Sequence, residues 1–154
     1  MQISTLTDEG FAFFGEVLTI PTAIGRYDAG AALSSHRPGA RPSLTLSLRD
    51  PVTLPLRVHR MERHAFSSQS FIPLAPVRFL VLVAPHAAAD GPDMAQARAF
   101  LAGPGQGVTY RADTWHHPMA ALDGPAHFAV LMWLDGGAGD EEFVDVAPFT
   151  IHLP

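Results

Sequence analysis

Proline and glycine interrupt this chain throughout, with 14 prolines and 13 glycines among its 154 residues. Between them, residues 43–48 (SLTLSL) alternate as in a half-buried strand, and residues 79–84 (FLVLVA) are apolar throughout, as in a strand covered on both faces. This pattern favours many short strands and turns over a helical bundle. Short helical segments are expected after Thr7, a typical N-cap, and within residues 92–101.

The composition excludes several classes of protein. Apolar residues make up 47% of the chain, as in a globular domain. The net charge is −5 and the basic residues are scattered, so we expect no nucleic-acid partner. The absence of cysteine excludes disulfides and cysteine-based zinc sites. Because no signal sequence follows Met1 and no apolar run reaches membrane-spanning length, we expect a cytoplasmic protein with no membrane partner.

Two polar motifs are expected at the ends of strands. Glu62 and His64 are two residues apart, so they share one face of a strand, and Gln69 follows after a short loop. Residues 105–118 are predicted to form two short strands around a polar turn, ending in two successive histidines. Since neighbouring side chains point to opposite faces of a strand, only one histidine should face inward, and we assign that position to His116. The two motifs should therefore meet in one polar cluster inside a small, mainly β, double-layer barrel.

Both motifs resemble those of the cupin superfamily. Residues 62–69 (Glu-x-His-x4-Gln) resemble the first cupin motif, and residues 105–116 (Gly-x5-Arg-x-Asp-x2-His) resemble the second. The first motif departs from the usual pattern, because Glu62 replaces a histidine and Gln69 replaces a glutamate. The resemblance implies a double-stranded β-barrel, or jelly roll, with one or two short helices, and a single cupin-like domain over residues 1–154.

A longer resemblance, from about residue 7 to residue 135, is to the ureidoglycolate lyase family. It is carried by Leu54-Pro55-Leu56, Glu62-Arg63-His64, Gln69-x-Phe71-Ile72-Pro73, Arg98-Ala99-Phe100, Gln106-Gly107-Val108-x-Tyr110 and Trp115-His116-His117-Pro118. This resemblance implies a carbon–nitrogen lyase that splits ureidoglycolate into glyoxylate and urea in allantoin and purine degradation. It also implies a homodimer and a divalent metal, named as nickel in the family, without an organic cofactor.

The four clustered residues offer the groups that this elimination needs. His64 or His116 can act as base for the hydroxyl proton, since histidine titrates near neutrality. Glu62 can act as acid for the departing nitrogen if burial raises its pKa. A divalent metal held by His64, His116, Gln69 and Glu62 can instead polarise the hydroxyl group. Which residue is acid and which is base stays open at this point.

Three further residues are candidates for binding the substrate. Arginine suits a carboxylate, and Arg49, at a strand end, is the first candidate and Arg26, in a loop, the second. Gln69 is the third candidate, and Arg63 should point away from the cluster because it alternates with its neighbours. His117 is expected to be structural, and the acidic residues 140–142 are expected to be solvated. The alternatives are another metallo-cupin enzyme acting on a small acid, and a non-catalytic ligand-binding cupin.

Overall fold

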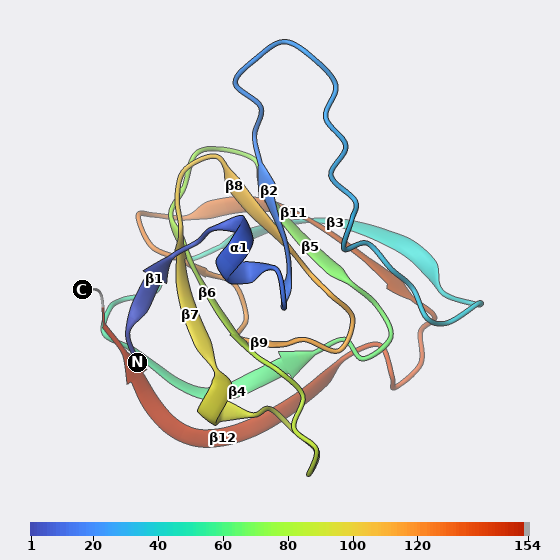
Figure 1. Cartoon of the computed structure of the whole chain (residues 1–154), viewed down its shortest axis with the longest axis vertical. Helices are drawn as coiled ribbons and strands as arrows, with labels where there is room; N and C mark the ends of the chain where they lie inside the picture. The colour runs from blue at the N-terminus through green and yellow to red at the C-terminus, as the bar shows by residue number, and fades with distance from the viewer. Residues whose placement is uncertain (153–154) are drawn as a thin grey trace.

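The computed structural model describes residues 1–152, whose strands form two facing sheets (Figure 1). One sheet has the strand order β1-β7-β6-β9-β4-β12, with β10 paired to β6, and the other has the order β2-β8-β5-β11-β3. The elements are β1 Ile3–Thr5, α1 Asp8–Phe11, β2 Gly15–Thr19, β3 Arg41–Arg49, β4 Leu56–Arg63, β5 Gln69–Pro73, β6 Phe79–Ala84, the 3-10 helix η1 Met94–Gln96, β7 Arg98–Ala102, β8 Gln106–Tyr110, β9 Trp115–His116, β10 Ala120–Ala121, β11 Ala126–Leu134 and β12 Glu142–Ile151.

This architecture confirms the predicted cupin-like jelly roll, although the two sheets pack as a sandwich and do not close into a barrel. The two short helices are also confirmed. Thr7 caps α1 by accepting a hydrogen bond from the Gly10 amide at 3.1 Å, as its position in the sequence predicts. Within residues 1–152, no helix has the length and apolar character needed to cross a membrane.

The core lies on both faces of β6, as its uninterrupted apolar sequence predicts. Phe79 and its alternate residues face the space between the sheets, where they join Phe11, Phe71 and Phe128. Phe79 and Phe128 meet edge to face, with ring centroids 5.6 Å apart. Trp115 belongs to a second buried cluster on the opposite face of the same sheet. The sheet that contains β4 and β9, the strands with the polar motifs, is therefore packed on both faces by apolar side chains.

Strand β3 is confirmed, but its apolar face points outward. Leu44, Leu46 and Leu48 are 68%, 75% and 60% exposed. The alternate residues of the strand, among them Thr45 and Ser47, line a cavity between the sheets. The reason is that β3 is an edge strand whose inner face borders this polar cavity instead of the aromatic core.

Candidate active site

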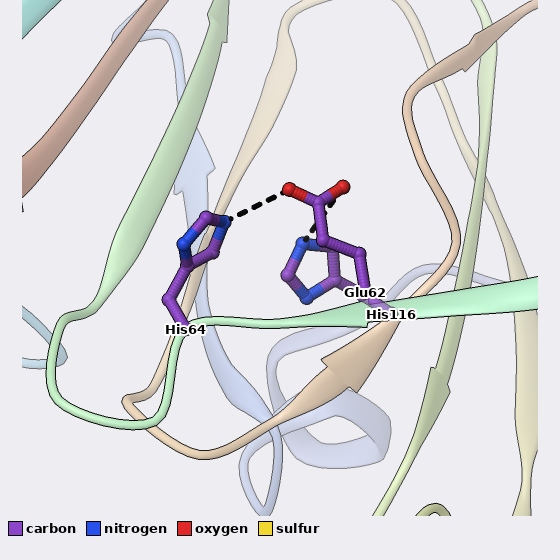
Figure 2. Close-up of side chains that lie close together, drawn as sticks. All are labelled: Glu62, His64 and His116. Carbon is purple, nitrogen blue, oxygen red and sulfur yellow. Dashed lines mark hydrogen bonds and ion pairs between the residues drawn. The ribbon is translucent and has the colours of Figure 1, made fainter. Parts of the chain in front are cut away.

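Strands β4 and β9 bring the predicted cluster together. They are antiparallel neighbours, and Glu62 lies opposite His116 in their register. His64 follows the end of β4 and returns to the same side as Glu62 (Figure 2). The three side chains each offer one ligand atom, and these atoms lie within 4.8 Å of one another. Glu62, His64 and His116 are only 8%, 2% and 1% exposed, so their interactions are poorly screened by solvent.

The His64 ring is held at both nitrogen atoms. Its Nδ1–H donates to the carbonyl oxygen of Asp140 at 2.7 Å, and its Nε2 lies 3.0 Å from Oε1 of Glu62. Burial would lower the His64 pKa, but the hydrogen bonds to Glu62 and Asp140 and the negative charges of Glu62 and Glu141 together outweigh it and raise the pKa above 6.5. The Glu62 carboxylate therefore favours the protonated form of the His64 ring.

Glu62 is ionised, which corrects the expectation that burial would make it an acid. Burial does act to raise its pKa, but the hydrogen bond from His64 and the charges of His116 and His64 prevail, and the pKa falls to about 2. Figure 2 shows the carboxylate beside the two imidazole rings, with one oxygen directed to each. In this position it can stabilise a proton on either ring.

His116 has a free nitrogen lone pair. Its Nδ1–H donates to the Thr114 carbonyl oxygen at 3.0 Å, so in the neutral ring Nε2 carries the lone pair. Nε2 is buried without a hydrogen-bond partner and lies 4.0 Å from Oε2 of Glu62. Burial lowers the His116 pKa to about 4, and the ring lies parallel to Tyr110 with centroids 4.3 Å apart. His116 is thus a neutral, oriented base or metal ligand.

The cavity beside the cluster has a volume of about 320 Å³ and contains two of the predicted substrate-binding residues. Glu62, Gln69 and Arg49 all line it. Gln69 is 4% exposed, and its Oε1 is buried without a partner, so this acceptor is available to a ligand. The cavity therefore combines a cation at Arg49, a free acceptor at Gln69 and the ionised carboxylate of Glu62.

The structure does not bring Arg26 to this cavity. Arg26 lies on the long loop between β2 and β3, which projects from the body of the molecule at the top of Figure 1. All of residues 21–31 are exposed. Because this segment extends away from the sheets, its arginine does not line the cavity as Arg49 does.

Two cavity residues were missed from the sequence. Glu141 lines the cavity, and burial together with the adjacent Glu62 carboxyl raises its pKa. The sequence instead predicts a solvated acidic loop at this position. Ser47 also lines the cavity, and its hydroxyl is buried without a partner. The signal for Ser47 was present, since the small polar residues of 43–48 form one face of that strand.

Arg63 and His117 lie outside the cluster, as predicted. Arg63 donates to Asp113 at 2.7 Å, forms an ion pair with Glu142 and lies 4.7 Å over the Trp115 ring. Its side chain is only 12% exposed, so it packs against the outer face of β4 and β9. His117 donates through Nδ1–H to the Pro118 carbonyl at 2.7 Å.

The donor set fits a divalent metal. Two imidazole nitrogens and a carboxylate suit borderline divalent ions such as nickel and zinc. The buried Nε2 of His116 has no protein partner, which is what a ligand atom requires. Gln69 lines the same cavity as Glu62, and its Oε1 is a buried neutral oxygen without a hydrogen-bond partner.

Comparisons with known proteins agree along the whole chain. A family model described as ureidoglycolate lyase matches residues 1–152. The ureidoglycolate lyase of Mesorhizobium japonicum is 37% identical over 158 residues, covering 97% of this chain and 95% of the relative. That of Rhizobium etli is 37% identical over 163 residues, covering 100% and 96%. That of Burkholderia cepacia is 37% identical over 141 residues, covering 85% and 78%.

A solved structure supports the architecture. A dTDP sugar isomerase from Desulfovibrio desulfuricans superposes with a TM-score of 0.53, covering 85% of this chain and 82% of that chain. The sequence identity is 15%, so the likeness concerns the fold alone.

Proposed function

The chain belongs to the ureidoglycolate lyase family, and we propose that it splits ureidoglycolate into glyoxylate and urea in the cavity beside Glu62, His64 and His116. The observation that carries this proposal is the buried, unpartnered Nε2 of His116, 4.0 Å from the Glu62 carboxylate that also holds Nε2 of His64 at 3.0 Å. Such a cluster can accept one proton and donate another without net change, as an elimination requires.

The cavity offers a complementary group for each part of the substrate. Ureidoglycolate carries a carboxylate, a hydroxyl and a ureido group on one carbon. The Arg49 guanidinium binds the carboxylate, since arginine matches its two oxygens. The free Oε1 of Gln69 and the Glu141 carboxylate accept hydrogen bonds from the ureido N–H groups. These contacts direct the hydroxyl toward Glu62, which lines the same cavity.

The proton transfers follow from the protonation states of the cluster. The Glu62 carboxylate accepts the hydrogen bond of the substrate hydroxyl, and His116 Nε2 behind it takes the proton as the carbonyl forms. The carbon–nitrogen bond breaks, its electron pair goes to nitrogen, and the His64 imidazolium supplies the proton to the departing urea. Glu62 directs one oxygen to each ring, 3.0 Å from Nε2 of His64 and 4.0 Å from Nε2 of His116, so it can relay the proton from His116 back to His64 once the side chains close the longer gap (Figure 2). No water is consumed.

A metal would be held by Glu62, His64 and His116, with Gln69 as a fourth donor. When bound, a divalent ion supplies a Lewis acid that lowers the pKa of the substrate hydroxyl. Nickel is the metal that the family resemblance implies. His64 would then act as a ligand, and its Nε2 would carry no proton while the metal is bound. We place the reaction in allantoin degradation on the same resemblance, and in the cytoplasm as the sequence predicts.

The outer face of β3, β11 and β5 supports a homodimer. Its exposed apolar residues are Leu44, Leu46, Leu48, Ile72 and Leu74. The register aligns Leu46 of β3, Ala129 of β11 and Ile72 of β5 in one row across the sheet. This leucine face is uncharged, so a second copy of the same face complements it around a two-fold axis.

Urea release from racemic ureidoglycolate tests the function directly. We expect urea and glyoxylate in equal amounts, above the rate of a control without enzyme, and no ammonia. Ammonia in place of urea would indicate hydrolysis of the ureido group instead of elimination. No product above the control would exclude the proposed activity.

A further inference from the structure

The orientation of His64 depends on one carbonyl group. Asp140 presents its carbonyl oxygen to Nδ1–H of His64 at 2.7 Å. A carbonyl oxygen only accepts, so this contact fixes the proton on Nδ1 and turns Nε2 toward Glu62. The position of the loop that carries Asp140 therefore determines where the reactive nitrogen of His64 points.

That loop, residues 135–140, is closed by the Asp140 side chain. The carboxylate accepts hydrogen bonds from the amides of Asp135 at 3.1 Å and Gly136 at 2.8 Å. The Asp140 amide donates to the Gly137 carbonyl at 3.1 Å. These bonds set the shape of the loop but do not attach it to the rest of the molecule.

Arg37 provides the attachment. Its Nη1 lies 2.8 Å from Oδ1 of Asp135, and its Nη2 forms an ion pair with Asp140. The side chain is 17% exposed, and its guanidinium lies 5.3 Å over the Phe66 ring. A Cβ at Gly139 would lie 3.3 Å from Phe66 and 3.6 Å from Arg37, so the loop packs closely on both.

The segment that ends in Arg37 also supports the chain just after His64. The His36 amide donates to the Phe66 carbonyl at 2.8 Å. Ser34 and Ser68 exchange hydrogen bonds, from the Ser34 amide to the Ser68 hydroxyl at 2.9 Å and from the Ser68 amide to the Ser34 carbonyl at 3.0 Å. Residues 34–37 therefore contact both segments that determine the placement of His64.

We propose that Arg37 is a positioning residue for His64, acting through the loop that carries Asp140. It does not line the cavity, so its effect on the reaction passes through the loop, which holds the His64 ring at Asp140 and continues into Glu141 of the cavity. The inference rests on the proposed function insofar as His64 serves the reaction. Contacts of this kind commonly change metal affinity or activity by about 10- to 100-fold when they are removed.

Arg37→Lys is the main test, because lysine keeps the charge but cannot bridge Asp135 and Asp140 with a planar fork. Arg78→Lys is the matched control, since Arg78 also contacts an aspartate, Asp123, through two nitrogen atoms, but at an exposed position. We expect Arg37→Lys to lower kcat more than it raises KM. We also expect it to weaken nickel binding, measured by calorimetry, by about 10- to 100-fold. Arg78→Lys should change neither.

Nuclear magnetic resonance gives a readout that needs neither metal nor turnover. In the wild type, the buried Nδ1–H of His64 should give a sharp signal, assigned by its loss in His64→Ala. Arg37→Lys should broaden or remove this signal well below the melting temperature. If Arg37→Lys lowers only the melting temperature and keeps both the signal and the nickel affinity, Arg37 is merely stabilising and the proposal is wrong.

Asp135→Asn serves if Arg37→Lys does not fold, because it removes one of the two carboxylates that the guanidinium bridges. Like Arg37→Lys, it should broaden the His64 signal and weaken nickel binding. Unchanged values for both would contradict the proposal. Failure of the wild type to release urea would overturn the proposed function alone. The His64 signal would still report whether Arg37 orients the ring.

Discussion

Glu62 and His116 face each other across β4 and β9, with Oε2 and Nε2 4.0 Å apart. This separation is too long for a hydrogen bond, yet short enough for both atoms to hold one ion. It leaves His116 with a buried lone pair that no protein group satisfies. A buried polar atom without a hydrogen-bond partner destabilises the fold, and such atoms are found where a catalytic group or a bound ion needs them.

Replacement of His116 by alanine should remove most activity and leave the fold intact. Loss of a general base typically lowers the rate by about 10²- to 10⁴-fold. His117→Ala is the control, because the His117 ring donates its hydrogen bond to the Pro118 carbonyl and lies outside the cluster. Urea release by both variants, with circular dichroism to verify folding, measures the difference. Near-wild-type rates for both would refute this assignment of the site.

Replacement of Arg49 should weaken substrate binding, whereas replacement of Arg26 should not. A charge-assisted hydrogen bond contributes about 1.5–3 kcal/mol, so Arg49→Met should lower kcat/KM by about 10- to 100-fold. Arg26→Met removes the same charge from a loop that does not line the cavity. A larger loss for Arg26→Met in steady-state kinetics would show that the loop reaches a substrate site after all.

Stability should decrease on acidification because His116 is buried in its neutral form. Its pKa is about 4 in the folded chain and about 6.5 in the unfolded chain, so between these values the unfolded chain binds more protons. The free energy of unfolding should therefore fall by about 2 kcal/mol from about pH 7 to about pH 4.5. Glu62, with a pKa of about 2, adds its own loss only below about pH 4.5.

Urea denaturation of wild type and His116→Ala at the two pH values checks this prediction. The variant lacks the buried imidazole, so its stability should depend less on pH in this range. The raised pKa of His64 has the opposite sign, because its stabilisation is present at low pH and is lost as pH rises through the folded pKa. An equal decrease in both proteins would assign the pH dependence to other groups.

Removal of divalent ions should distinguish the two roles of the cluster. If a metal carries the reaction, a chelator should abolish urea release, and added nickel should restore it. If His116 and His64 act alone, the chelator should have no effect, and the rate should rise with pH as the base loses its proton. His116→Ala treated in the same way shows whether the restored activity depends on this site.

Disruption of the leucine face should separate the proposed homodimer. Leu46→Arg places a charge on the row formed by Leu46, Ala129 and Ile72, and like charges then meet across the two-fold axis. Sedimentation equilibrium should show the wild type at twice the 16.5 kDa mass of one chain and the variant at that mass. A wild type that sediments only as a single chain at micromolar concentration would exclude the dimer.

The sequence predicted the cluster because its geometry follows from local rules. Glu62 and His64 share a face by strand periodicity, and of the successive residues His116 and His117 only one can point inward. The alternation of apolar and polar residues also predicted β3. It could not predict which face of the strand is buried, because the inner face of β3 borders a polar cavity. Glu141 was missed because its position depends on a loop folding back onto a distant strand, and no local pattern encodes that contact.

The polar face of β3 and its leucine face are two sides of one strand. Ser47 and Arg49 border the cavity, while Leu46 and Leu48 lie on the outer surface. If two copies meet at the leucine face as proposed, only a single sheet would separate each reaction chamber from the neighbouring subunit. Sequence changes on the outer surface of β3 that alter how the subunits fit together would then shift the cavity side of the same strand, where Arg49 is proposed to bind the carboxylate. Substrate preference in this family would thereby evolve together with its quaternary contacts.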